Sequence, residues 1–466
     1  MTPRIVGLET EYALMALPHG PAAPAMAPAE AITELFRGTA TQHRSHNRFL
    51  PNGGRLYVDI GSHPEYATAE CSNARDAALQ DRAGELILQR MLEAANERLD
   101  SHRLHLLKTN TDSGDATFGC HENYQVKRET LDPLDPGFVA FLVARTVLSA
   151  GGGLDKSGAY VLSPRAFHIH RVQSADPTRL RPMISTRDEP HADPAAFARL
   201  QVTFGDSTVS DAATEIRLRL TSAVLDMIEG GVSLCDLALA DPIASLHDCS
   251  RHGPAAILAL RSGGAVSALD LLDTVVGRCE AAGIDSLLDI RDMIDRMQGG
   301  EQDTLSPSVD WICKKLLLTE AADRYGPSDP CIPRLNLAFH DLDPRRGLAD
   351  RLRASGAMSA LPFEDVERAV STPPSDTRAA LRGRFIAEAT RLERAYSVSW
   401  THIRLDSPPH PQIDLLNASQ CSDSRVADLV DVMAMTPAPP MSRLARLRAG
   451  LGPLHHAGEE PPANRP

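Results

Sequence analysis

Residues 55–70, RLYVDIGSHPEYATAE, combine side chains that could perform chemistry with the spacing of a β-strand. Successive side chains on a strand point to opposite faces, so Arg55, Tyr57 and Asp59 share one face. The other face is expected to anchor the strand through three apolar residues, Leu56, Val58 and Ile60. Further polar residues follow at once: His63, Glu65 and Glu70. This row is typical of a functional site; the alternative is a polar sheet face held by ordinary ion pairs.

A second group of carboxylates lies near the N-terminus, where Glu9 and Glu11 share one face of the first predicted strand. If the two strands are neighbours, these carboxylates converge with Asp59 and Glu65 in one cavity. Carboxylates a few ångströms apart repel each other and cannot all ionise cheaply. Mg²⁺ with oxygen ligands and substrate phosphates is the usual solution. The alternative is that Glu9 and Glu11 pair with arginines at a sheet edge.

Two further polar segments could contribute to a site: KTNTDSGDATFGCHENY at residues 108–124 and TRDEPHAD at residues 186–193. The first ends with His121, Glu122 and Asn123 where a strand resumes, although a single histidine is more often structural. The second favours phosphate or substrate handling, with a solvated loop as the alternative. No G-x-G-x-x-G or G-x-x-x-x-G-K-[ST] loop occurs, so the motifs support neither a Rossmann nor a P-loop site.

The elements that must position these residues predict an α+β fold with an antiparallel sheet. Strand patterns occur at residues 4–12, 55–60, 104–108, 122–127, 200–204 and 399–405. Helical patterns occur at residues 29–36, 73–99, 214–230 and most of 255–330, and Asn73 is a candidate cap for the second. The break STPPSD at residues 371–376 and a Pro-, Arg- and Gly-rich end predict three regions: 1–370, 371–435 and a disordered tail, 436–466.

Composition narrows the classes of function. The formal net charge of −13 argues against general nucleic-acid binding, although Lys314 with Lys315, Arg345 with Arg346, or Arg378, Arg382 and Arg384 could form a local basic groove. No apolar run approaches the roughly 20 residues that span a bilayer, and the N-terminus lacks a secretion signal, so we expect a cytoplasmic protein without a membrane partner. The eight cysteines form no C-x-x-C pair, which argues against a structural zinc site.

Taken together, several motifs in order resemble the Pup–protein ligase and Pup deamidase/depupylase family. They are GLETEYA (7–13), NGGRLYVDIGSHPEYATAEC (52–71), TNTDSGDATFGCHENY (109–124), STRDEPHAD (185–193), GDS (205–207), AFHDLDPRRGL (338–348) and PPSDTRAALRGRF (373–385). The resemblance implies a glutamine-synthetase-like catalytic domain with an antiparallel sheet cradle, followed by a small C-terminal domain. It also implies ATP, Mg²⁺, the ubiquitin-like modifier Pup and lysine-bearing protein substrates.

The resemblance assigns roles residue by residue. Glu9, Tyr57 and Glu65 match the Mg²⁺ ligands of the family, and Asp59 matches its catalytic aspartate. The positions that match its ATP contacts are Arg55, Thr68 and Trp400. A lysine nucleophile has an ordinary pKa of about 10.4, so deprotonating it at pH 7 costs about 4 to 5 kcal/mol. A carboxylate such as that of Asp59 can orient the amine and accept its proton.

Two residues depart from the family pattern. Gln201 stands where the family usually has a histidine near the metals, and Thr208 stands where asparagine usually follows GDS. We therefore expect one metal subsite to be weakened or rebuilt.

Within the family, the sequence is closer to the ligase branch. The hydrolase branch typically carries a long insertion before the catalytic strand, whereas only positions 37–54 separate Phe36 from Arg55 here. The sequence DIGSHPEYATAEC and Cys120 before HENY also resemble the ligase branch. The alternatives are a depupylase or deamidase that lacks the loop, a non-catalytic Pup-binding homologue, and a ligase of small molecules.

Overall fold

The computed structural model describes residues 3–20, 24–37, 46–112, 114, 116–176, 181–407 and 409–435. Within these residues, eight strands form the main sheet, and all neighbours run antiparallel except β10 and β11. In spatial order they are β10 (Arg171–Ser174), β11 (Pro182–Ser185), β12 (Phe197–Val202), β7 (Cys120–Lys127), β1 (Val6–Glu11), β5 (His63–Ala67), β4 (Arg55–Asp59) and β3 (Arg48–Phe49). The predicted α+β class with an antiparallel sheet is confirmed.

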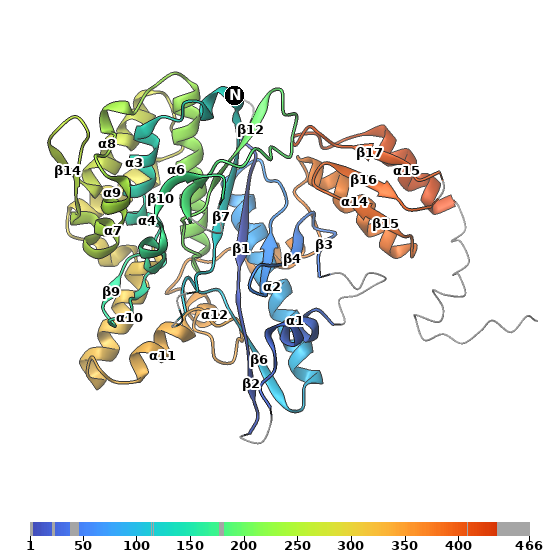
Figure 1. Cartoon of the computed structure of the whole chain (residues 1–466), viewed down its shortest axis with the longest axis horizontal. Helices are drawn as coiled ribbons and strands as arrows, with labels where there is room; N and C mark the ends of the chain where they lie inside the picture. Colours follow the sequence, from blue (N-terminus) through green and yellow to red (C-terminus); the bar gives the residue numbers. More distant parts are fainter. Residues whose placement is uncertain are drawn as a thin grey trace, which may run out of the picture.

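Helices pack against one face of this sheet, and Figure 1 shows most of them gathered on one side of β1 and β7. The apolar side chains of β1, β7 and β12 share one core with them, so the opposite face of these strands is left to polar residues. The helices between β5 and the C-terminal part of the chain, most of which contribute to this core, are α2 (Ala74–Arg98), α3 (Pro136–Ala144), α4 (Thr146–Ser149), α6 (Asp211–Glu229), α7 (Pro242–His252), α8 (Ala268–Ala281), α9 (Leu288–Gln298), α10 (Asp310–Tyr325), α11 (Cys331–Ala338), α12 (Ala349–Ala354) and α13 (Phe363–Ala369).

The long helix α2 supports the strands that carry the site. It starts where expected, because the Asn73 side chain accepts a hydrogen bond from the backbone N–H of Asp76 at 2.8 Å. It approaches β5 closely at Gly84, where a Cβ atom would lie 2.2 Å from the Tyr66 ring. On β1, the Thr10 hydroxyl donates to Asp81 of this helix at 2.8 Å. Since Tyr66 and Thr10 point toward α2, their neighbours in sequence point to the other face.

Two smaller units flank the main sheet. An arm of β2 (Ala13–Pro18), β6 (His102–Leu107) and α1 (Pro28–Phe36) extends away from the sheet in Figure 1, and its apolar cluster continues onto α2 and onto Leu56 and Tyr66 of the main sheet. The C-terminal unit, drawn in orange and red, lies near β3 and β4 and has another cluster. It comprises α14 (Arg378–Arg391), β15 (Tyr396–Val398), β16 (His402–Leu405), β17 (Gln412–Asp414) and α15 (Ser424–Met435). The predicted division near residue 370 stays a prediction, and the predicted tail lies outside the described residues.

Three local expectations were incomplete or wrong. The strand at 55–60 is one half of a hairpin, because β5 pairs with it antiparallel after a turn at Gly61 and Ser62, whose φ angles are +89° and +65°. Ile60 lies in this turn with 74% of its surface exposed, so it anchors nothing. The region 255–330 also contains the hairpin of β13 (Ile257–Ala259) and β14 (Ala265–Ser267). A further short pair joins β8 (Gly153–Leu154) and β9 (Tyr160–Val161).

In the described part of the chain, no helix is both long enough and apolar enough to cross a membrane.

Candidate active site

The polar face of five adjacent strands forms the candidate site. The registers bring Glu11 opposite Glu65, and Glu65 opposite Tyr57, so β5 carries its carboxylate between β1 and β4. On the other side, His121 of β7 pairs with Glu9. The predicted convergence of the early carboxylates therefore occurs, and it occurs inside the sheet rather than at an edge.

The carboxylates make an acidic cluster of two overlapping groups. Ligand atoms of Glu9, Glu65 and His121 lie within 4.8 Å of one another, and so do those of Glu11, Asp59 and Glu65. Burial, followed by the negative charges of Glu9 and Glu11, raises the pKa of Glu65 well above its ordinary value. A cation with a preference for oxygen ligands would relieve this repulsion, so the donor set fits Mg²⁺.

Tyr57 joins the acidic cluster through a hydrogen bond. Its hydroxyl donates to Glu65 Oε1 at 2.6 Å. Burial and the charges of Glu9 and Glu65 raise the pKa of Tyr57 well above its ordinary value, so the phenol is neutral at physiological pH. Arg55 lies on the outer side of this ring, with its guanidinium carbon 4.4 Å from the ring centroid, and donates to Asn47 at 2.9 Å.

Asp59 and Glu11 complete the outer edge of the cluster. Asp59 lies at the exposed end of β4, opposite His63 in the hairpin. Desolvation of its carboxyl group and the neighbouring charge of Glu11 raise the pKa of Asp59. His63 lies 3.0 Å from Glu11 Oε2 through Nδ1. Asp59 is thus a reachable carboxylate whose proton affinity is increased by its neighbours.

Both carboxylate oxygens of Glu9 have nitrogen atoms of other side chains as neighbours. Gln201 donates to Oε2 at 3.1 Å, His121 Nδ1 lies 3.6 Å from the same oxygen, and Arg199 lies 3.5 Å from Oε1. Burial opposes ionisation of Glu9, yet His121 and Arg199 hold its pKa below the ordinary value. The alternative of arginine pairing holds only for Glu9, which lies inside the sheet rather than at its edge, whereas Glu11 pairs with His63. Thr208, the other departure, is buried against Thr214 of α6 at 2.8 Å.

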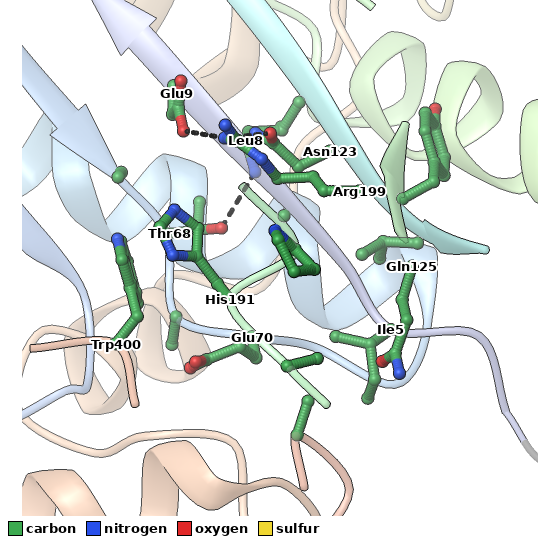
Figure 2. A pocket seen from close by; sticks show the side chains of 18 of the residues that line it. Ile5, Leu8, Glu9, Thr68, Glu70, Asn123, Gln125, His191, Arg199 and Trp400 are labelled. Atoms are coloured by element: carbon green, nitrogen blue, oxygen red, sulfur yellow. Dashed lines mark hydrogen bonds and ion pairs between the residues drawn. The ribbon is translucent and has the colours of Figure 1, made fainter. Parts of the chain in front are cut away.

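An apolar cavity begins beside Glu9. Its lining comes from β1, β5 and β7 and the residues next to them, from Arg199 of β12, from residues 190–192, and from Arg378, Trp400 and Ala418 of the C-terminal unit. In Figure 2, Glu9 lies at one end and Ile5 and Gln125 at the other. The wall is formed largely by aliphatic side chains and the Trp400 indole, which suits a flat heteroaromatic group.

Thr68 and Trp400, two of the three residues predicted to contact ATP, line this cavity, whereas Arg55 is not among its lining residues. Thr68 is buried, and its hydroxyl oxygen accepts a hydrogen bond from the Leu8 backbone N–H at 3.0 Å (Figure 2). The Trp400 ring contacts Phe49 edge to face, with centroids 4.8 Å apart, and lies 6.5 Å from the His191 ring. Arg55 lies near the same edge, 5.8 Å from the Phe49 ring.

The structure also sorts the other polar residues singled out in the sequence. His121 and Asn123 face the site, whereas Glu122 points into the core and pairs with Arg145 at 2.6 Å. Sequence reasoning missed Arg199 of β12; strand alternation with Gln201 could have found it. The proposed basic groove is wrong for three of its members, because Lys314, Arg378 and Arg382 are buried.

Comparison with known proteins gives consistent matches across the chain. A family described as Pup-ligase protein matches residues 4–404. Pup–protein ligases from Mycolicibacterium vanbaalenii and Mycolicibacterium smegmatis are each 36% identical over 457 residues, covering 93% of this chain and 100% of the relative.

Two solved structures are similar in fold. The complex between Pup and its ligase PafA has a TM-score of 0.85 and 30% identity, covering 98% of this chain and 99% of that one. The Pup ligase PafA in complex with ADP has a TM-score of 0.79 and 32% identity, covering 90% and 96%.

Proposed function

The chain belongs to the Pup-ligase family, and from this premise we propose that it joins the C-terminal glutamate side chain of Pup to a lysine of another protein, using ATP. One observation carries the proposal. The similarity spans the full length of relatives named Pup–protein ligase, and the matched region contains an acidic cluster that opens beside an apolar cavity. The cavity can hold a nucleotide, and the acidic cluster can hold the cation that phosphoryl transfer needs.

We assign the cavity to ATP. A relative of similar fold binds ADP, and the apolar lining with Trp400 suits stacking against a base. Thr68 lines the same space, and Arg55 offers a positive charge beside the acidic cluster for a phosphate. In this arrangement the phosphates extend toward Glu9, at the end of the cavity nearest the other carboxylates.

We assign the acidic cluster to Mg²⁺. Glu9 and Glu65 would supply carboxylate oxygens, and Tyr57 would present the oxygen of a neutral hydroxyl group, which keeps its proton and donates it in a hydrogen bond to Glu65. His121 is close enough to contribute a nitrogen. When bound, the cation offsets charge on the transferred phosphoryl oxygens, which is the usual contribution of metals in such sites.

The residues of the chain would then divide the remaining work. The γ-phosphate of ATP passes to the Pup carboxylate, giving an acyl phosphate and ADP. The substrate lysine attacks the acyl carbon, phosphate leaves, and the amine loses a proton. Asp59 is the base in this proposal, because its carboxylate is exposed and its raised pKa favours proton acceptance.

The second candidate function is depupylation or Pup deamidation. The names of the relatives and the short connection between α1 and β4 favour the ligase. The third candidate is a non-catalytic Pup-binding homologue. It is motivated by Gln201, which donates to Glu9, and by Thr208, since both residues depart from the pattern expected for the family. Cytoplasmic location remains a prediction from the sequence.

An assay with two forms of Pup separates these readings. The protein would be incubated with ATP, MgCl₂, a lysine-bearing protein and Pup ending in glutamate or in glutamine. We expect isopeptide conjugates, detected by mass spectrometry, with the glutamate form alone. Ammonia release from the glutamine form without conjugation would establish the hydrolase reading, and Pup binding without ATP turnover would establish the non-catalytic one.

A further inference from the structure

A buried carboxylate at the far wall of the cavity is held by two arginines. Glu70 follows β5, lines the cavity and has 10% of its side-chain surface exposed. Arg378 donates to its Oε1 at 2.7 Å, and Arg382 binds both of its oxygens, with 3.1 Å to Oε1. The two guanidinium groups are themselves almost fully buried. With both oxygens engaged by arginine, Glu70 is suited to hold neighbours in place rather than to contact a ligand.

Arg382 connects this carboxylate to the aromatic wall of the cavity. Its guanidinium lies 5.0 Å from the Trp400 ring centroid and donates to the Trp400 carbonyl at 3.2 Å. It also lies 5.3 Å from the Phe49 ring and donates to the Gly53 carbonyl at 2.8 Å. The position and tilt of the Trp400 indole are therefore tied to Arg382 through both its ring and its backbone.

Arg378 connects the same carboxylate to the opposite wall. It donates to the carbonyl of His191 at 2.6 Å, and His191 has a positive φ of +49°, which a non-glycine residue adopts only when its surroundings hold it. Arg378 also donates to the Leu415 carbonyl at 2.8 Å, and its backbone N–H donates to Ala418 at 3.0 Å. Segments far apart in sequence thus meet at one guanidinium.

The charges explain why both arginines depend on Glu70. Two guanidinium groups side by side in a buried place repel each other, and only an anion between them offsets that cost. The other acceptors named above are neutral backbone carbonyls, so without the Glu70 charge both groups would be drawn toward water. Figure 2 shows Glu70 below the cavity, between Trp400 and the Ile5 end.

We propose that Glu70 is the positioning residue of the nucleotide cavity: through Arg382 it fixes Trp400, and through Arg378 it fixes the backbone at His191. This inference rests on the proposed function, since it takes the cavity to bind ATP. It adds a residue that acts through others, and it makes the C-terminal unit part of the nucleotide site. Removing the charge of Glu70 loosens both walls at once, whereas the acidic cluster at Glu9 and Glu65 is untouched.

The test is Glu70→Gln, which keeps the shape and removes the charge. We expect ADP affinity, measured by calorimetry, and the KM for ATP to worsen about tenfold or more, because charge-assisted hydrogen bonds are lost. The KM for Pup should stay the same. Quenching of tryptophan emission by ADP should also weaken, since Trp311 is buried elsewhere and Trp400 lines the cavity.

Glu85→Gln is the matched control. Glu85 of α2 is buried more deeply than Glu70, accepts from Lys108 at 2.7 Å and pairs with Arg82 and Arg353, yet it does not line the cavity. It should lower the temperature of unfolding as Glu70→Gln does, but leave ADP affinity unchanged. A merely structural role for Glu70 would make the two variants behave alike.

The outcomes separate this inference from the proposed function. If the unaltered protein binds no ADP, the assignment of the cavity to a nucleotide fails. If it binds ADP and folded Glu70→Gln binds equally well, the positioning role is overturned. Should Glu70→Gln fail to fold, the inference can be tested with Arg382→Lys and Arg378→Lys, which keep the positive charges. Each is expected to weaken ADP binding several-fold, and unchanged affinity in both would contradict the inference.

Discussion

The two ends of the site contain glutamates of opposite electrostatic character. Glu70 is flanked by two arginines, and although burial opposes ionisation, they lower its pKa to about 2. Glu65 is buried to a similar extent, but its charged neighbours are other carboxylates, so its pKa is raised well above the ordinary value. The same residue type is therefore permanently ionised in one place and reluctant to ionise in the other.

The difference distinguishes a completed structural pair from a site that lacks a partner. Around Glu70 the positive charges are supplied by the chain itself, so the arrangement is stable before any ligand arrives. Around Glu65 the chain brings carboxylates together without an equal number of cations, which costs stability and creates affinity for a metal ion. Proteins often accept such a cost at functional sites.

Replacing Glu65 should give the largest effect. Glu65→Gln removes a proposed Mg²⁺ ligand, and a metal clamp contributes several kcal/mol, so ATP turnover should fall about 1,000-fold. Because the pKa of Glu65 is raised in the folded protein, its ionised form opposes folding near pH 7. The variant should therefore unfold at a higher temperature than the unaltered protein in Mg²⁺-free buffer. A lower unfolding temperature of the variant in Mg²⁺-free buffer, or retained ATP turnover, would contradict the contrast drawn between Glu65 and Glu70.

The ionised side chain of Glu70, in contrast to that of Glu65, should stabilise the folded protein, and acid unfolding should show this. Its lowered pKa means that its contribution to stability is complete above its ordinary value near 4.5 and is lost as the pH falls toward 2. A shift of this size corresponds to about 3 kcal/mol. In urea titrations between pH 5 and pH 2.5, the free energy of unfolding of Glu70→Gln should therefore fall less steeply than that of the unaltered protein. Parallel curves would mean that Glu70 does not hold its arginines as described.

The smallest effect is expected at Gln201. This amide donates to Glu9, at a position where the resemblance to the family leads us to expect a histidine. Gln201→His should change the affinity for Mn²⁺ by about three- to tenfold and make it weaken below about pH 6.5, since a protonated imidazole repels a cation. Calorimetric titration without nucleotide measures this directly. Identical affinity and pH dependence in both proteins would remove Gln201 from the cation site.

Much of the fold could be predicted from pattern alone. The cap and periodicity of α2 and the periodicity of α6 located those helices within a few residues, because these signals are local. The β4–β5 hairpin was not foreseen: Gly61 and Ser62 turn the chain within a stretch that continues the alternation, and the sequence HPEYA has no clear strand signal. Ile60 was misplaced for the same reason.

The candidate site was predictable where motifs carry it and not where it depends on packing. Glu9, Glu65 and Asp59 lie together as expected, because their strands pair in register. The role of Glu70 could not be read from the chain, since its partner Arg378 lies 308 residues away and only the docking of the C-terminal unit unites them. The pairing of Gln201 with Glu9 also depends on sheet order, because β7 separates their strands.

The most direct test of the whole account is the release of ADP in a single turnover of Asp59→Asn with ATP, Mg²⁺ and Pup ending in glutamate. If Asp59 acts on the lysine and the other residues act on the nucleotide, the variant should release ADP to the same extent as the unaltered protein. Its rate of conjugation to lysine should fall at least about 100-fold, the usual size of a general-base contribution. Loss of the ADP release, or conjugation at an undiminished rate, would contradict the division of work between Asp59 and the residues that act on the nucleotide.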